Sequence, residues 1–193
     1  MIAIRQERKT DATARELLLD RAYGPARFTK CSARLREDRL PAAGLSFVAT
    51  EGGMIVGSVR LWDVSAGSGQ RALMLGPLAV SPEHQSKGIG GKLMKQAIAT
   101  ARMRGHGAIL LVGDAPYYGR FGFFAEKSGL LAMPGPYQPD RLLALELHAG
   151  ALDGARGTIA ATGRLAPKSV PEFGARAAAV SNRAVKSPTS RAA

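Results

Sequence analysis

The sequence predicts a mixed α+β fold in which helices flank a central, mostly antiparallel sheet, and two observations lead to this prediction. Three β-rich runs follow one another between residues 45 and 80, with only short turns between them. An apolar helical repeat then begins near Gly88, and another apolar run, AILLVG, follows it at residues 108–113. Because a helix separates the last two strands, they are expected to run parallel in a right-handed strand–helix–strand unit.

The first 40 residues are predicted to supply one strand and two helices. Ile2 and Ile4 alternate along MIAIR and indicate a first strand. The sequence TARE at residues 13–16 has the form of a capping box, so the first helix is expected to begin there and to end at Gly24-Pro25. Residues 28–40 predict a second, more polar helix.

Turn residues and periodicity define the remaining elements. Residues 45–50 and 54–63 are separated by Glu51-Gly52-Gly53, which predicts a hairpin with glycines at positions of positive φ. Residues 71–80 form the third strand, and the helix after Gly88 ends near Gly105. A short helix at 116–121 and a strand at 142–148 complete the domain. The apolar face of the long helix consists of Ile89, Leu93, Met94, Ala97, Ile98 and Ala101.

Composition divides the chain into one domain at residues 1–150, an extension at 151–166 and a basic tail at 167–193. The extension has one candidate strand at 157–160, and the tail is expected to be disordered. Residues 155–193 carry seven Lys and Arg and only Glu172 as an acid, so they hold half of the net charge of +12. Nucleic-acid contact through this tail is one interpretation. A plain basic tail is favoured, because only Phe173 is aromatic and no motif accompanies the charges.

Several functional classes are disfavoured by the composition. Cys31 is the only cysteine, so neither an internal disulfide nor a cysteine metal cluster can form, and a cytoplasmic location is expected. The histidines, His84, His106 and His148, are scattered and predict no metal site. No apolar run approaches the roughly 20 residues that span a bilayer, and MIAIRQERKT lacks a signal-peptide pattern.

The glycine-rich segment LGPLAVSPEHQSKGIGGKLM, residues 75–94, predicts an anion site. Gly88, Gly90 and Gly91 stand at a helix start, although glycine costs roughly 1 kcal/mol against alanine inside a helix. The first turn of a helix has unpaired N–H groups, and glycine lets a phosphate approach them. A Walker A loop is excluded by Ser86 and Leu93, and Leu93 also replaces the third glycine of a dinucleotide fingerprint.

Gln85-x-x-Gly88-x-Gly90 is the Q/R-x-x-G-x-G/A signature of the GNAT superfamily of acetyl-CoA-dependent N-acetyltransferases, which the sequence resembles. In AILLVGDAPYYGRFGF, Tyr118 is followed four and five residues later by Gly122 and Phe123, as in that family. The resemblance covers roughly residues 2–148 and is similar to the YhbS-like branch. It implies the acetyltransferase fold, with one splayed pair of parallel strands.

The resemblance also implies a co-substrate, acetyl-CoA, and a reaction in which a neutral amine attacks the thioester directly. Tyr118 matches the family's acid, which serves the leaving sulfur, whereas Tyr117 is expected to line the core or the substrate pocket. The alternative for Tyr118 is an aromatic that only packs against the cofactor. The implied cofactor-binding residues are Leu78, Ala79 and Val80 for the pantetheine arm, Gln85, Ser86, Lys87, Gly88, Ile89, Gly90 and Gly91 for the pyrophosphate, and Tyr118 and Phe121.

The general base stays open, because residues 71–80 lack the acid that many relatives carry there. Asp114 is the first candidate, either capping the helix that follows it or orienting a water. Glu37 and Asp63 are more distant candidates, and a chain of waters would serve equally. The missing acid also leaves a non-catalytic acyl-CoA-binding module as the alternative function.

The acceptor amine, a small molecule or a protein, is not defined by the sequence. The resemblance assigns its binding to residues 21–41 and the loop at 66–70, and a homodimer remains one option. Residues 21–41 are basic, which favours an acceptor with an acidic part.

Overall fold

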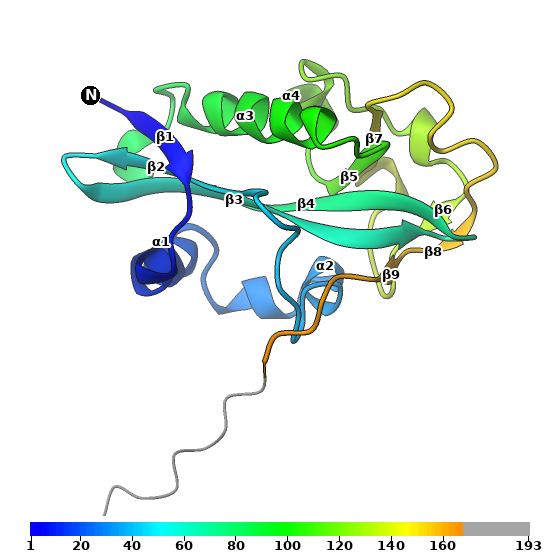
Figure 1. Cartoon of the computed structure of the whole chain (residues 1–193), viewed down its shortest axis with the longest axis horizontal. Coiled ribbons are helices and arrows are strands. Elements are labelled where there is room, and N and C mark those ends of the chain that lie inside the picture. Colours follow the sequence, from blue (N-terminus) through cyan, green and yellow to red (C-terminus); the bar gives the residue numbers. More distant parts are fainter. Residues whose placement is uncertain (168–193) are drawn as a thin grey trace, which may run out of the picture.

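The computed structural model describes residues 1–167, which form one twisted sheet between two layers of helices (Figure 1). The strand order is β1-β2-β3-β4-β5-β7, and the small strand β9 pairs with the side of β3. All pairs along this path are antiparallel except β4 with β5, which is parallel. The predicted α+β fold with one parallel strand pair is therefore confirmed.

The bounds of the elements follow the chain closely. The strands are β1 (Ala3–Gln6), β2 (Ser46–Glu51), β3 (Met54–Ala66), β4 (Gln70–Val80), β5 (Ala108–Val112), β6 (Leu131–Ala132), β7 (Leu142–Glu146), β8 (Gly157–Thr158) and β9 (Ala160–Ala161). The helices are α1 (Ala12–Tyr23), α2 (Cys31–Arg34), α3 (Ile89–Met103) and α4 (Ala115–Gly119). Helices α3 and α4 cover one face of the sheet, and α1 and α2 lie on the other (Figure 1).

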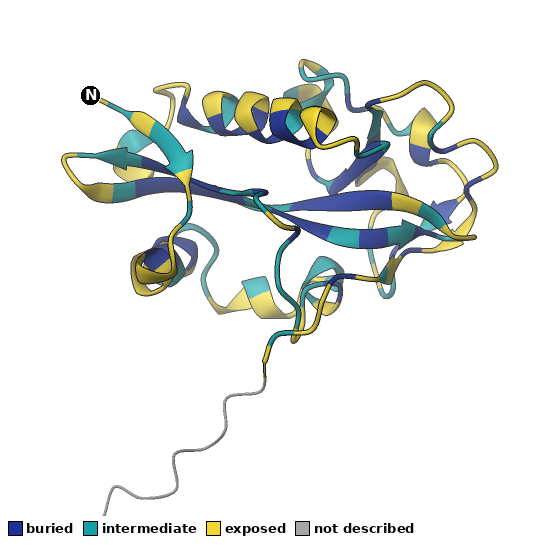
Figure 2. Ribbon diagram, in the orientation of Figure 1, coloured by how far each residue is buried: buried dark blue, intermediate teal, exposed yellow. Residues whose placement is uncertain are grey.

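The core lies on both faces of the long strands β3 and β4. Figure 2 shows the buried residues running along these strands and along the side of α3 that faces them. On α3, the buried side chains include Leu93, Met94 and Ala97, and the opposite side of the helix is exposed. The predicted apolar face is therefore confirmed. Burying it supplies most of what holds this helix on the sheet, since hydrophobic burial outweighs helix propensity.

The hairpin between β2 and β3 forms as predicted. Gly52 and Gly53 have φ values of +55° and +83°. Residues other than glycine are strained at such positive φ values. Tyr23 is followed by Gly24 at the C-cap of α1, also with positive φ, so the predicted end of that helix is confirmed.

The predicted start of α1 and the predicted second helix are wrong. Helix α1 begins at Ala12 with Asp11 at its N-cap, so TARE at 13–16 lies within the helix. Asp11 prevails because its carboxylate accepts hydrogen bonds from the Arg8 backbone N–H and from the Arg5 guanidinium. Between residues 28 and 40 only α2 is an α-helix. The chain leaves it because Leu40 donates its N–H to the carbonyl of Arg164, 2.8 Å away.

The C-terminal segment packs on the domain as far as it is described. β8 pairs with β6, and β9 pairs with β3 at Val64 and Ser65. Leu152 and Ile159 are buried with Trp62 and Leu110 in one cluster. The residues expected to hold one short strand thus form two. The basic tail lies outside the described residues, apart from Pro167.

Candidate active site

The sheet opens between β4 and β5. β4 pairs with β5 only at Leu73 and Met74, although β4 remains paired with β3 as far as Val80. Arg60 of β3 stands opposite both Gly76 and Pro77 of β4, which is a β-bulge. Bulges bend and twist a strand. Beyond Met74, β4 consequently turns away from β5 and leaves an unpaired edge.

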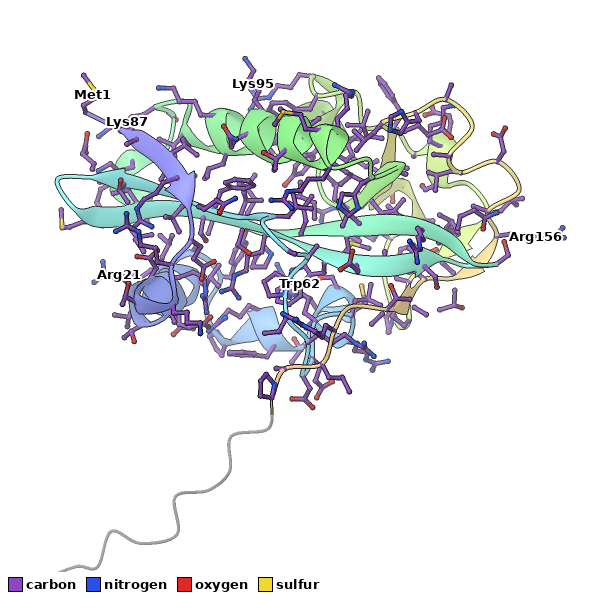
Figure 3. All side chains as sticks on the ribbon, in the orientation of Figure 1. Met1, Arg21, Trp62, Lys87, Lys95 and Arg156 are labelled. Atoms are coloured by element: carbon purple, nitrogen blue, oxygen red, sulfur yellow. The ribbon has the colours of Figure 1, made fainter. Side chains whose placement is uncertain are left out.

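A cavity of about 800 Å³ occupies this opening. One side, here called the strand wall, consists of residues 75–78, 111–114, Tyr117 and Tyr118. The opposite side, the helical wall, consists of cavity residues from α1, from α2 and from the segments around them. Its members are Arg15, Glu16, Leu19, Tyr23, Arg27, Phe28, Lys30, Ser32, Ala33, Arg34, Arg36 and Glu37. Arg60, Trp62 and Met74 join the two walls, and Figure 3 shows Trp62 on the face of the sheet that α1 and α2 cover.

Tyr118 lies at the edge of the opening on the short helix α4. Its ring packs so closely on Gly113 that a Cβ at residue 113 would overlap it. The ring of Phe123 lies edge-on 6.2 Å away and fixes the other side. Burial raises the pKa of the Tyr118 phenol above its ordinary value of 10, with a smaller contribution from Tyr23. The phenol is therefore protonated at neutral pH and is available as a hydrogen-bond donor.

Tyr117 connects the cavity to the start of α3. Its hydroxyl oxygen lies 2.8 Å from the point where a Cβ on Gly90 would stand. Its ring lies edge-on to Tyr118 at 4.9 Å, and the Arg120 guanidinium stacks on its other side at 4.0 Å. Of the two expectations for Tyr117, core or substrate pocket, the structure places it on the lining of the cavity. Its approach to Gly90 was missed because the two residues lie far apart in the sequence.

The glycine-rich turn presents backbone to solvent at the N-terminus of α3. Gln85, Ser86, Lys87 and Gly88 are exposed, and both Ser86 and Gly88 have positive φ. The side chain of Ile89 is fully buried, so only its backbone is offered to a ligand. Unpaired N–H groups at a helix start form a ready anion site, strengthened by the helix dipole.

A histidine holds this turn against the β2–β3 hairpin. His84 Nε2 lies 2.9 Å from a carboxylate oxygen of Glu51, and His84 Nδ1 lies 3.2 Å from the Ser81 hydroxyl. The hydrogen bond from His84 lowers the pKa of Glu51. His84 thus has a structural partner, which the sequence analysis had not assigned to it.

The strand residues expected to bind the pantetheine arm have different surroundings. Leu78 lines the cavity, whereas Ala79 is buried against Leu18 and Leu19 of α1. The carbonyl of Leu78 accepts a hydrogen bond from the Tyr23 hydroxyl. The carbonyl of Gly76 accepts one from Trp62 Nε1 at 2.6 Å. Aromatic side chains therefore bond two backbone carbonyls in the stretch of β4 that is not paired with β5, and sequence patterns did not indicate this.

Asp114 lies where β5 ends and α4 begins. Its backbone carbonyl accepts the N–H groups of Tyr117 and Tyr118, both at 3.0 Å. Its carboxylate makes no capping hydrogen bond, and the residue is exposed at the cavity. Of the two roles considered for its side chain, the capping role is therefore absent. Phe121 lies beside Tyr117, with ring centroids 5.8 Å apart, and outside the cavity.

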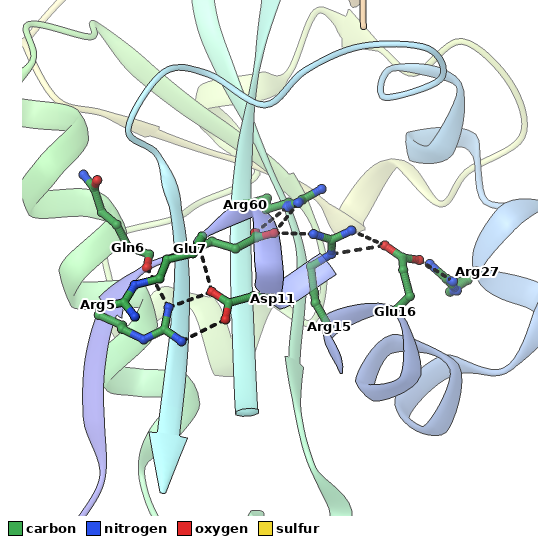
Figure 4. Close-up of polar contacts among 9 residues, drawn as sticks. Arg5, Gln6, Glu7, Asp11, Arg15, Glu16, Arg27 and Arg60 are labelled. Atoms are coloured by element: carbon green, nitrogen blue, oxygen red, sulfur yellow. Dashed lines mark hydrogen bonds and ion pairs between the residues drawn. The ribbon is translucent and has the colours of Figure 1, made fainter. Parts of the chain in front are cut away.

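The helical wall rests on a network of ion pairs (Figure 4). Glu7 binds both Arg60 of β3 and Arg15 of α1, and its side chain is only 6% exposed. Glu16 then joins Arg15 to Arg27, whose guanidinium lies 2.6 Å from the carboxylate. Buried charges need such partners, because an unpaired one carries a large desolvation penalty.

Other classes of site find little support in the part of the chain that is described. Among residues 1–167, no three His, Cys, Asp or Glu side chains are grouped so that they could hold a metal ion. In the same range, none of the helices has the length and hydrophobicity needed to cross a membrane.

Residues 42–124 match the family model described as an acetyltransferase (GNAT) domain. With the open strand pair and the glycine turn in place, the chain belongs to the GNAT family of acetyltransferases. It is 34% identical over 132 residues to the uncharacterized N-acetyltransferase YjhQ of Escherichia coli K12, covering 67% of this chain and 72% of that protein. Identity to YhbS of the same strain is 31%, over 62% of this chain and 72% of YhbS.

Solved structures show the same likeness. The structure of YhbS from Escherichia coli in complex with CoA has a TM-score of 0.72 and 26% identity, covering 83% of this chain and 89% of that one. A GNAT family acetyltransferase from Brucella melitensis in complex with acetyl-CoA has a TM-score of 0.57 and 32% identity, covering 79% and 99%. The expected family and the resemblance to YhbS are thereby confirmed.

Proposed function

We propose that this protein transfers the acetyl group of acetyl-CoA to a primary amine. The observation that carries the proposal is the parting of β4 from β5 beside a protonated Tyr118. An unpaired strand edge can bind an extended chain through backbone hydrogen bonds, as in β-strand addition. The pantetheine arm contains two amides and suits such an edge. The solved relatives named above bind CoA or acetyl-CoA, which supports the same cofactor here.

The pyrophosphate of the cofactor would bind at the turn from Gln85 to Gly91. The backbone N–H groups at the start of α3 supply the donors, and Lys87 adds positive charge. Gly90 allows close approach, and Tyr117 stands beside it. This arrangement would place the thioester in the strand gap, near Tyr118, with the acceptor entering from the helical wall.

The reaction is a direct attack by the neutral amine. The amine nitrogen forms a bond to the thioester carbon and gives a tetrahedral intermediate, from which the C–S bond breaks. The Tyr118 hydroxyl donates a hydrogen bond and then its proton to the departing sulfur. The surplus proton of the amine leaves through water to the base. Asp114 is the candidate base on the strand wall, and that proton can finally return to the Tyr118 oxygen.

The test is release of free thiol from acetyl-CoA with a panel of primary amines. The proposal expects release that depends on the amine, together with an acetylated product in the mass spectrum. A protein that binds acetyl-CoA in calorimetry but releases no thiol with any amine would instead be a non-catalytic acyl-CoA-binding module. Asp114→Asn provides a further arm, because loss of a base shifts the pH dependence of kcat/KM.

A further inference from the structure

The cavity carries more positive charge than its acids can neutralise. The cationic cavity residues are Arg15, Arg27, Lys30, Arg34, Arg36, Arg60 and Arg141, and the acidic ones are Glu16, Glu37 and Asp114. Two acids, Glu7 and Glu16, form ion pairs with these arginines, and each already binds two of them. Glu7 serves Arg15 and Arg60, and Glu16 serves Arg15 and Arg27 (Figure 4).

Arg36 differs from the other arginines of the cavity, each of which has an ion pair or a hydrogen bond to a backbone carbonyl. It lines the cavity directly after α2, and within residues 1–167 its side chain forms no ion pair and no hydrogen bond. Every fully enclosed side-chain nitrogen in that range does have a partner, so the Arg36 nitrogens are accessible to solvent at a residue that lines the cavity. Burial lowers the pKa of Arg36, although Tyr23 and Glu16 act in the opposite sense. Arginine nevertheless stays charged, because its ordinary pKa is about 12 or higher.

We propose that Arg36 determines acceptor specificity by binding an oxyanion, carboxylate or phosphate, on the acceptor amine. The guanidinium offers a planar fork of N–H donors that matches either group in two parallel hydrogen bonds. An anion there would supply the partner that Arg36 lacks among residues 1–167. This inference rests on the proposed acetyl transfer, because it names the acceptor class for that reaction.

Arg36, Tyr23 and Tyr118 line the same cavity, which leads to the strand gap. Burial raises the pKa of the Tyr23 phenol, although the positive charge of Arg36 opposes the rise, and the Tyr23 hydroxyl donates to the Leu78 carbonyl on β4. An acceptor held by its anionic end at Arg36 can therefore extend toward Tyr118 within one cavity. At about 800 Å³ the cavity fits a small molecule or a chain end, since ligand pockets measure about 300–1,000 Å³.

The experiment compares matched amines. The probes are straight-chain ω-amino carboxylates, ω-amino alcohols of equal length and the phosphate esters of those alcohols, each tested for thiol release from acetyl-CoA. We expect the anionic probes to exceed the alcohols in kcat/KM by about tenfold to a hundredfold, as hydrogen bonds to charged groups do. The ratio of carboxylate to phosphate identifies the preferred oxyanion.

Variants then assign the preference to one side chain. Arg36→Gln should remove the preference for anionic probes and leave kcat/KM for the alcohols nearly unchanged, while Arg36→Lys should restore part of it. The matched control is Arg21→Gln, which removes the same charge from an exposed position on α1 outside the cavity (Figure 3). If Arg36 served only folding, Arg36→Gln would lower kcat/KM for both probe classes alike.

The two proposals can fail separately. Equal kcat/KM for anionic and neutral amines in the unaltered protein would overturn the role of Arg36 and leave acetyl transfer standing. If no amine is acetylated, calorimetric titration with an ω-amino carboxylate in the absence of acetyl-CoA decides the question. Binding that Arg36→Gln abolishes would uphold the oxyanion site, and equal binding by both proteins, or none by either, would overturn it.

Discussion

The two walls of the cavity are built by different means. The strand wall depends on backbone, namely an unpaired edge of β4 and a close approach of Tyr118 to Gly113, and Tyr117 connects it to the bare start of α3. The helical wall depends on charged side chains brought together from the segment after β1, from α1 and from β3 (Figure 4). A backbone-built wall suits a ligand that never changes, whereas a wall of side chains can be altered by single substitutions.

In the proposed reaction, the strand wall carries the chemistry and the helical wall chooses the acceptor. Tyr118 sits at the strand gap with a raised pKa, and Arg36 lines the same cavity with donors that have no partner among residues 1–167. Substitutions on the strand wall should therefore change kcat or cofactor affinity. Those on the helical wall should change stability or acceptor preference.

The largest expected effect is on the strand wall, for Tyr118→Phe. Removing the hydroxyl removes the proton donor to the leaving sulfur, and a general acid typically contributes about 10²- to 10⁴-fold. We expect kcat to fall well over tenfold, while the calorimetric Kd for acetyl-CoA stays nearly constant. The matched control is Tyr137→Phe, which removes a hydroxyl bonded to the Leu131 carbonyl at 3.2 Å, outside the cavity. Near-normal turnover of Tyr118→Phe would leave that residue only a packing role.

The second effect is on stability and concerns the buried ion pairs that support the helical wall. Glu7→Gln leaves Arg15 and Arg60 without their shared carboxylate, and removing one partner of a buried ion pair costs about 3–5 kcal/mol. Denaturant unfolding should show a loss of that order. Asp20→Asn is the control, because Asp20 is 54% exposed and its pair with Arg27 is worth at most about 1 kcal/mol. Similar losses for both variants would contradict the view that buried charges hold this wall.

The same contrast explains what the sequence could predict. The glycine turn and the strand wall are encoded locally, since Gln85, Gly88 and Gly90 lie within six residues and Tyr118 lies within a motif of its own. The parallel pairing of β4 and β5 followed from the helix between them. The hydrogen bond from Tyr23 to the Leu78 carbonyl could not be predicted from a local pattern, because 55 residues separate the two.

The helical wall was predicted only as a basic region. A second, more polar helix was expected at residues 28–40, yet only the short α2 forms there, and the backbone of Leu40 pairs with Arg164 instead. The ion pairs could not be predicted either, because Glu7, Arg15 and Arg60 come from three separate parts of the chain. The sequence could therefore show an excess of charge and not which arginine lacks a partner.

The third prediction tests whether Gly90 and Gly91, at the start of α3, both contact the bound acetyl-CoA. A Cβ on Gly90 would stand 2.8 Å from the Tyr117 hydroxyl, whereas one on Gly91 would meet only Phe121, at 3.9 Å. Gly90→Ala should raise the Kd for acetyl-CoA about tenfold, an energy of about 1.4 kcal/mol. Gly91→Ala should leave that Kd nearly unchanged and raise stability by up to about 1 kcal/mol, since alanine favours helix. Equal effects on Kd would mean that Gly91 is also a contact.

The smallest expected effect is a pH dependence at the start of α1. The hydrogen bond from Arg5 lowers the pKa of Asp11 from 3.8 to about 2. Because the folded pKa lies below the unfolded one, this carboxylate stabilises the fold fully above about pH 4, and the contribution is lost as the pH falls toward about 2. Arg5 is partly exposed, so solvent screening reduces the effect to about 1 kcal/mol.

The unfolding free energy of Asp11→Asn should therefore approach that of the unaltered protein as the pH falls through this range. Asp140→Asn, at an exposed position, is the control and should keep a constant difference. If the Asp11 difference is equally constant, this ion pair adds nothing to the stability of the fold.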